Sequence, residues 1–197
     1  MIHNIEGDFM TINFLFKLLM SDKPSRNLVV FEKELFELIP ELEVCKGFDQ
    51  KNEWHIYDVY QHILCVVDNV PNDLVSRVAA LFHDVGKPLS FTEDENGVGH
   101  FYGHWEESQK IFDEFARKYN LDKDFAKQVS NLILYHDKRV KNMSDEEMRE
   151  LYQIFGNEGL KRLFDFKRAD LLAQNKKFHG GLRDIDNQEK KMLLKYN

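Results

Sequence analysis

Residues 79–88 read Ala-Ala-Leu-Phe-His-Asp-Val-Gly-Lys-Pro, a short apolar run that ends in a His-Asp pair followed by Gly, Lys and Pro. An imidazole nitrogen and a carboxylate oxygen side by side at a helix end can bind one divalent metal ion. The ammonium group of Lys87, three residues after Asp84, can hold a phosphate beside that ion. The stretch therefore indicates a metal site that acts on a phosphorylated molecule.

Further nitrogen and oxygen ligands lie on both sides of this stretch. They are His62, His104, His136 and Asp170. A lone histidine on an apolar helix face is usually a hydrogen-bonded core residue, but several together favour shared ligation, because each is costly to bury unpartnered. His62 follows Val59 by three residues and precedes Val66 by four, so it faces the core side of its helix. Asp170 follows Phe166 by four residues and lies on an apolar stripe; the alternative for it is a salt bridge to a basic neighbour (Arg162, Lys167 or Arg168).

These residues predict a site of nitrogen and oxygen ligands without thiolate. Such a set fits Mn²⁺, Fe²⁺, Co²⁺, Ni²⁺ or Zn²⁺, and Mg²⁺ more weakly because of the imidazoles. The first choice is one ion, since fewer groups must then converge, and its expected ligands are His62, His83, Asp84 and Asp170. His104 and His136 are candidates for a second ion bridged by Asp84, or for substrate contact.

We predict Asp84, Lys87 and His104 as the catalytic residues. A metal-bound water would be the nucleophile, and Lys87 would balance the charge that develops on the phosphate. The alternative interpretation of Lys87 is a solvent-exposed lysine on the surface. The alternative interpretation of Gly86 is that it only ends the helix. His55 and His100 form a second tier, as side chains that line the cleft or donate a proton, or as structural hydrogen-bond partners.

The His-Asp dipeptide occurs a second time, at residues 136–137. This copy lacks the small apolar residues before it and the Gly-Lys after it. We therefore predict that Asp137 is not a ligand.

The overall pattern is helical. Ten glycines and four prolines among 197 residues are few, which favours long helices, and helical periodicity dominates the chain. Helices are expected over residues 9–20, 28–39, 56–70, 73–84, 104–119, 123–135, 144–155 and 159–173. Asn72 is the expected N-cap of the fourth, and Ser144 with Glu147 forms a capping box. Residues 88–103 are predicted to be a loop, and the chain from about Asn175 a partly loose end.

We predict an all-α fold with one main domain. An N-terminal helical segment, residues 1–50, is expected to pack on a domain formed by residues 51–197, most simply as one compact unit. Two cysteines are too few for a disulfide framework, and no apolar run approaches the length of about 18 residues that a membrane span needs. A cytoplasmic protein without membrane attachment is the expectation.

Five segments in this order resemble a known family. They are residues 39–42 (Ile-Pro-Glu-Leu), 55–62, 79–87, 99–104 (Gly-His-Phe-Tyr-Gly-His) and 168–175 (Arg-Ala-Asp-Leu-Leu-Ala-Gln-Asn). Together they are similar to the HD-domain metal-dependent phosphohydrolases, and closer still to the helical C-terminal half of bacterial CCA-adding tRNA nucleotidyltransferases. The resemblance implies an HD-domain helical bundle with metal ligation by His62, His83, Asp84 and Asp170.

By the same resemblance, the expected activities are those of a 2′,3′-cyclic phosphodiesterase, a 2′-nucleotidase or a phosphatase on nucleotides or RNA ends. Because the nucleotide-adding half is missing from this sequence, we expect no addition of nucleotides to tRNA. The alternatives are a catalytically silent RNA- or protein-binding helical module and, as a minority view, a nucleoside triphosphate or alarmone hydrolase. Net charge −7 argues against general RNA binding, although residues 138–197 carry a basic excess. The sequence sets no oligomeric state.

Overall fold

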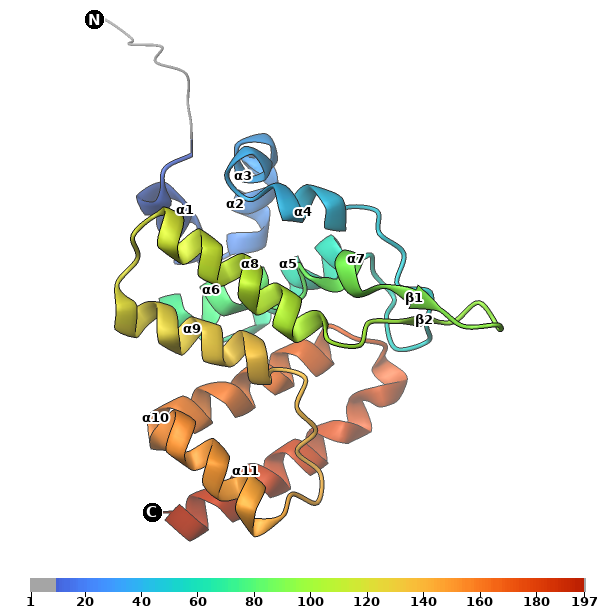
Figure 1. Cartoon of the computed structure of the whole chain (residues 1–197), viewed down its shortest axis with the longest axis vertical. Coiled ribbons are helices and arrows are strands. Elements are labelled where there is room, and N and C mark those ends of the chain that lie inside the picture. Colours follow the sequence, from blue (N-terminus) through green and yellow to red (C-terminus); the bar gives the residue numbers. More distant parts are fainter. Residues whose placement is uncertain (1–9, 197) are drawn as a thin grey trace, which may run out of the picture.

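The computed structural model describes residues 10–196 as a bundle of helices with one short hairpin at its side (Figure 1). In chain order the elements are α1 (Ile12–Leu19), α2 (Pro24–Val30), α3 (Glu32–Leu38), α4 (Pro40–Cys45), α5 (Val59–Asn69), α6 (Leu74–Phe82), α7 (Lys87–Ser90), β1 (Thr92–Glu93), β2 (Gly99–His100), α8 (His104–Lys118), α9 (Lys123–Tyr135), α10 (Asp145–Leu172), η1 (Lys176–Gly181) and α11 (Leu182–Tyr196). The predicted all-α class is confirmed.

The N-terminal helices α1–α4 pack on the central helices, with α2 and α4 against α5 and α1 against α6. The single helix predicted over 28–39 is wrong, because the chain forms α2 and α3 with a break at Phe31. The Phe31 backbone leaves helical geometry there, and its ring packs edge-on against Phe14 with centroids 5.0 Å apart. The break still lets Leu28 and Leu35 both enter the core, each fully buried. Phe9, the first residue of the expected first helix, lies outside the described residues.

Helices α5 and α6 form the centre of the bundle. Asp58 caps α5 by accepting the Gln61 N–H, so the helix begins three residues later than expected. The predicted cap of α6 is also off by one: Asp73, and not Asn72, accepts the backbone N–H of Ser76 at 3.0 Å. Residues 76–82 of α6 are all buried, which places the helix end in the interior of the protein.

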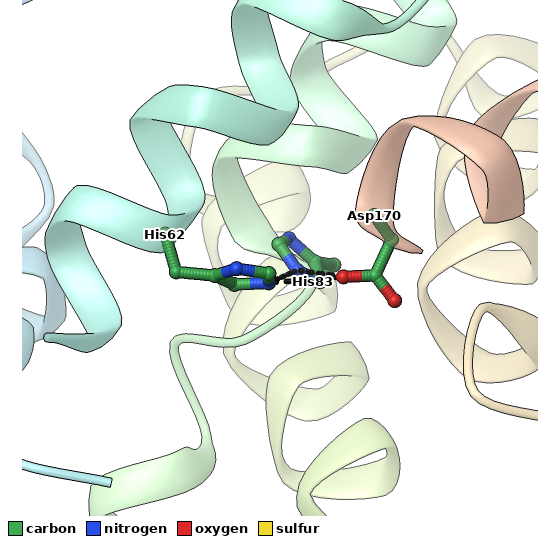
Figure 2. Close-up of side chains that lie close together, drawn as sticks. All are labelled: His62, His83 and Asp170. Atoms are coloured by element: carbon green, nitrogen blue, oxygen red, sulfur yellow. Dashed lines mark hydrogen bonds and ion pairs between the residues drawn. The ribbon is translucent and has the colours of Figure 1, made fainter. Parts of the chain in front are cut away.

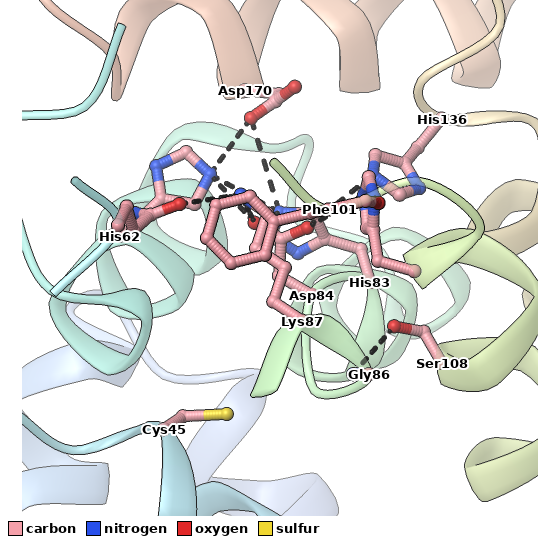
Figure 3. Close-up of polar contacts among 12 residues, drawn as sticks. Cys45, His62, His83, Asp84, Gly86, Lys87, Phe101, Ser108, His136 and Asp170 are labelled. Carbon is pink, nitrogen blue, oxygen red and sulfur yellow. Dashed lines mark hydrogen bonds and ion pairs between the residues drawn. The ribbon is translucent and has the colours of Figure 1, made fainter. Parts of the chain in front are cut away.

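Gly86 lies where the chain leaving α6 touches α8. A Cβ atom at this position would lie 2.5 Å from the Ser108 backbone nitrogen and 2.6 Å from the His104 carbonyl oxygen. The Gly86 N–H donates to the Ser108 hydroxyl oxygen at 2.9 Å, a bond visible in Figure 3. The interpretation of Gly86 as only a helix stop is therefore wrong, because the close approach to α8 requires a residue without a side chain.

Residues 88–103 are more ordered than the loop we predicted. They contain α7 and an antiparallel hairpin that pairs Thr92 with His100 and Glu93 with Gly99. Gly99 packs so closely that a Cβ atom would lie 2.4 Å from the Gln50 carbonyl oxygen. The hairpin is thereby fixed against the segment before α5.

The C-terminal residues differ most from expectation. In α10 the capping box of Ser144 and Glu147 is confirmed, and the non-helical backbone of Gly156 (φ 57°) separates two helical parts, as predicted by the two helices expected over 144–155 and 159–173. The loose end predicted after Asn175 is wrong, because η1 and α11 pack back on α10. The Arg168 side chain of α10 binds acidic residues of α11, and Ile185 and Met192 of α11 are buried.

Candidate metal centre and substrate cavity

Six side chains from five helices meet in the interior of the bundle. Figures 2 and 3 label all of them except His104. His62 comes from α5, His83 and Asp84 from the end of α6, and His104 from the start of α8. His136 follows the last residue of α9, and Asp170 lies in the last turn of α10. They are the residues that the sequence proposed as ligands of one or two ions: His62, His83, Asp84, His104, His136 and Asp170.

Three of the histidines are oriented by the same local hydrogen bond. The Nδ1–H groups of His83, His104 and His136 each donate to the backbone carbonyl three residues earlier, at 2.8, 2.8 and 2.7 Å. A carbonyl oxygen can only accept, so the Nδ1 atom carries a proton, and the tautomer of the neutral ring that fits this bond has its lone pair on Nε2. This bond is the usual second contact of a metal-binding histidine.

The Asp84 carboxylate lies between two pairs of histidines. Its Oδ2 atom is 3.3 Å from His62 Nε2 and 3.1 Å from His83 Nε2. Its Oδ1 atom is 3.2 Å from His104 Nε2 and 3.6 Å from His136 Nε2. One carboxylate therefore faces both pairs, which is the bridging position that a two-ion arrangement would need.

Asp170 joins the first of these pairs. Its Oδ1 atom lies 2.9 Å from His62 Nε2 and 4.0 Å from His83 Nε2. Figure 2 draws the three side chains. Burial alone would raise the pKa of Asp170, but the contact with His62 and the nearby His83 lower it below the ordinary value for an aspartate. The carboxylate stays ionised at neutral pH.

The alternative salt bridge from Asp170 to a basic neighbour is wrong within the described part of the chain. Arg162 reaches Asp73, the N-cap of α6, and Arg168 binds acidic residues that include Asp186. Lys167 donates to two backbone carbonyls instead. The ion pairs of Asp170 among residues 10–196 are those with the two histidines.

The donor set of the cluster fits a divalent cation. Neither carboxylate oxygen of Asp84 has a hydrogen bond of ordinary geometry from the described residues, although both are fully buried. Burial disfavours the anion, yet the neighbouring His83 and Lys87 side chains hold the pKa of Asp84 well below its usual value. The cluster thus needs positive charge at its centre, and a divalent ion supplies it while it uses the Nε2 lone pairs.

The cluster contains two groups of three candidate ligands. Within each group, the three ligand atoms all lie within 4.8 Å of one another. One group is His62, His83 and Asp170, and the other is His83, Asp84 and His136. The first belongs to the predicted four-ligand set. The second brings in His136, which the one-ion prediction had left to a second ion or to the substrate.

Lys87 is held inside the site by a residue that sequence reasoning missed. Its side chain is only 4% exposed, so the alternative of an exposed surface lysine is wrong. Its ammonium lies 2.7 Å from Asp84 Oδ2 and donates to the Gln50 side-chain oxygen at 2.8 Å. Gln50 lies between the helices predicted over 28–39 and 56–70, and no spacing in the sequence links it to Lys87.

Lys167 is a second residue that the sequence did not assign to the site. Its ammonium is buried and donates to the carbonyl oxygens of His136 at 2.5 Å and Lys138 at 2.6 Å. Burial lowers the pKa of Lys167 to about 8. The side chain fixes the end of α9 to α10, and with it the backbone of His136.

A cavity of about 300 Å³ opens over the cluster, and Asp84, Lys87, His104, His136 and Asp170 are part of its wall. The second-tier histidines also line it. Burial, with the charge of Lys87, lowers the pKa of His55 to about 2, so this imidazole is neutral and packs edge-on against His62. His100 lies at the rim with Nε2 3.2 Å from an Asp94 carboxylate oxygen.

Comparison with known proteins matches this architecture to a family. The family model described as "HD domain" matches residues 53–174, which include all six clustered residues. The chain belongs to the HD domain family. HD domains are in general metal-dependent phosphohydrolases, and the His and Asp groups of the cluster are able to hold a divalent metal.

The curated relatives of this HD protein are longer. The chain is 31% identical over 166 residues to a CC-adding tRNA nucleotidyltransferase of Thermus thermophilus, which covers 80% of this chain and 35% of the relative. It is 30% identical to an A-adding tRNA nucleotidyltransferase of Deinococcus radiodurans (62% and 30%), and 31% identical to a Multifunctional CCA protein of a Janthinobacterium species (54% and 26%). The chain thus spans about a third or less of each.

No helix in the described residues is long and apolar enough to cross a membrane.

Proposed function

We propose that this HD protein hydrolyses phosphate esters of nucleotides, or 2′,3′-cyclic or 2′-phosphate RNA ends, with a divalent metal ion. One observation carries the proposal: five buried side chains and the partly buried Asp170 bring their imidazole nitrogens and carboxylate oxygens together in one cluster beside a cavity. Mn, Ni, Co, Fe, Zn and Mg ions are the candidates. His62, His83, Asp84 and Asp170 would hold one ion, and His104 and His136 with Asp84 are candidates for a second.

When bound, a divalent ion lowers the pKa of a coordinated water and polarises a phosphoryl oxygen. The residues of the chain bind and orient the substrate around that chemistry. The Lys87 ammonium, fixed by Gln50, lies beside Asp84 in the cavity wall, where it would neutralise charge on the phosphoryl oxygens. His104, held by the Phe101 carbonyl, would position the substrate from the opposite side of Asp84.

A metal and substrate screen tests the proposal. The purified protein is assayed with Mn²⁺, Ni²⁺, Co²⁺ and Mg²⁺ against 2′,3′-cyclic AMP, 2′-AMP and p-nitrophenyl phosphate, with a nucleoside triphosphate and guanosine tetraphosphate added for comparison. We expect metal-dependent turnover of the monoester or cyclic substrates that Asp84→Ala abolishes. Faster turnover of the pyrophosphate-containing substrates would replace the proposal by a triphosphate or alarmone hydrolase, and no turnover with any metal would refute it.

A second candidate is a catalytically silent RNA-binding module. It is supported by the relatives, whose names describe enzymes that add nucleotides to tRNA. This candidate predicts salt-sensitive binding of tRNA that survives loss of His83 and Asp84. A filter-binding assay with wild type and Asp84→Ala at two salt concentrations separates it from the first, since the hydrolase proposal requires these side chains for function.

A further inference from the structure

The cavity over the cluster has an aromatic rim that metal and phosphate chemistry does not require. Its wall includes Trp54, Phe101, Tyr102 and Trp105. The chain has two tryptophans, and both line this one cavity. A phosphate ester without an aromatic ring would be bound through its phosphate, at Lys87 and the metal-binding residues. It would have no use for these four aromatic side chains.

Trp54 is held at the rim but remains accessible. Its indole stacks on Phe178, with ring centroids 3.6 Å apart and planes inclined by 19°. Its carbonyl oxygen accepts the N–H of Asn175, so the segment before α5 is joined to the start of η1. The side chain is nevertheless 48% exposed, which leaves indole surface available to a ligand.

Tyr102 is a second fixed and exposed ring. Its ring lies parallel to that of His100, with centroids 5.5 Å apart and an angle of 8° between the planes. His100 is in turn held by Asp94. The Tyr102 side chain is 76% exposed, although a large aromatic surface in water is unfavourable. Two orientated rings at the mouth of a phosphate site are typical of base-stacking platforms.

We propose that Trp54, Tyr102 and Trp105 bind the nucleobase of the substrate by stacking, while its phosphate lies at Lys87 and the metal-binding residues. The inference rests on the proposed function and deepens it, because it names the side chains that bind the base of the proposed nucleotide substrate. A cavity of about 300 Å³ is at the lower end of the range for small-molecule sites. Since every base has a π-face, stacking favours bases in general and selects weakly among them.

Tryptophan fluorescence tests the inference without any need for turnover. Excitation at the red edge of indole absorption reports only Trp54 and Trp105, which both face the cavity. The metal-supplemented protein is mixed with 2′-AMP, ribose 5-phosphate or inorganic phosphate in a stopped-flow instrument, and the fluorescence is recorded before the first turnover. We expect 2′-AMP to quench the emission and to bind about tenfold more tightly than ribose 5-phosphate. Equal affinity for the two ligands would overturn the inference.

Substitutions locate the effect. Tyr102→Leu keeps an apolar side chain but removes the ring. Because Tyr102 is exposed, the substitution should leave the folded structure intact. We expect it to weaken 2′-AMP binding several-fold and to leave ribose 5-phosphate binding unchanged. The matched control is Tyr57→Leu, an exposed tyrosine that is not part of the cavity wall, which should change neither affinity. Equal effects of the two variants would contradict the assignment.

The two proposals fail in different ways. If no phosphate ester is hydrolysed but 2′-AMP still quenches and outcompetes ribose 5-phosphate, the proposed function is wrong and the stacking site stands. If esters with and without a base are hydrolysed and bound equally well, the stacking site is wrong and the hydrolase stands.

Discussion

The two His-Asp pairs of this HD protein share one local geometry and differ in where their aspartates lie. His83 ends α6 and His136 ends α9, with backbone angles near −58° and −37° in both cases. Each imidazole donates from Nδ1 to the carbonyl three residues earlier. Both histidines are buried in the same cluster, so a helix end suffices to aim an imidazole. Asp84 is 1% exposed at the centre, whereas Asp137 is exposed at the cavity wall.

The residues on the C-terminal side of each pair explain the difference. After Asp84 the chain reaches Gly86, which packs directly on the backbone of α8 and is bonded to Ser108. That contact holds the turn inside the bundle and keeps the carboxylate between the histidines. After Asp137 comes Lys138, whose side chain lies 3.5 Å from the exposed Glu150 carboxylate. Imidazole position is thus a local property, while the burial of the carboxylate depends on packing between helices.

The largest expected effect comes from removing the two aspartates one at a time. Asp84→Ala deletes the carboxylate shared by both histidine pairs, so bound metal should be lost and kcat/KM should fall by about a thousandfold or more. Elemental analysis of the purified protein and steady-state kinetics measure the two quantities.

Asp137→Ala is the matched control at the second pair. Its carboxylate is exposed and belongs to neither group of candidate ligands, so metal content should be unchanged and kcat/KM should stay within about threefold of wild type. Equal losses in the two variants would remove the distinction between the pairs.

Stability should respond strongly to the contact that buries the first pair. In Gly86→Ala, the new Cβ atom meets backbone atoms of α8 at 2.5 and 2.6 Å, and backbone cannot rotate away as a side chain can. We expect the free energy of unfolding to fall by about 3 kcal/mol and Tm by about 6 to 12 °C in thermal denaturation. Gly180→Ala is the control, because a Cβ there meets nothing within 4 Å. Similar melting temperatures for both variants would show that α6 and α8 can separate at no cost.

The same contrast shows what the sequence could predict. Helix periodicity and the ordered histidines and aspartates were enough to predict the all-α class and to select six side chains that the structure brings together. His62, His83 and Asp170 could be selected because each follows apolar residues at helical spacing, which places it on the side of its helix that faces the core. The His136-Asp137 pair could be separated from His83-Asp84 by the Gly-Lys that occurs only after the latter.

The rest depended on contacts between distant segments. Gln50 meets Lys87, and Lys167 meets the end of α9, through side chains that no periodic pattern links. The ordered C-terminal residues were missed for a similar reason: α11 is polar by composition, and only its packing on α10 through Ile185 and Met192 shows that it has a buried side. Asn72 failed as a cap because Asp73 one residue later offers the same acceptor chemistry with both carboxylate oxygens on Ser76.

The smallest expected effect concerns the contact that supports the second His-Asp pair. Gly86 and Ser108 hold the first pair, whereas the Lys167 ammonium of α10 holds the second by its bonds to the carbonyls of His136 and Lys138. Lys167→Met keeps the length of the side chain but leaves these carbonyls unpaired, so the His136 imidazole loses its fixed backbone. We expect metal affinity to fall about tenfold in isothermal titration, against no change for Lys161→Met on the exposed face of the same helix. A purely structural role would lower Tm and leave the metal affinity of the folded protein intact, and that outcome would show that the second pair needs no support from α10.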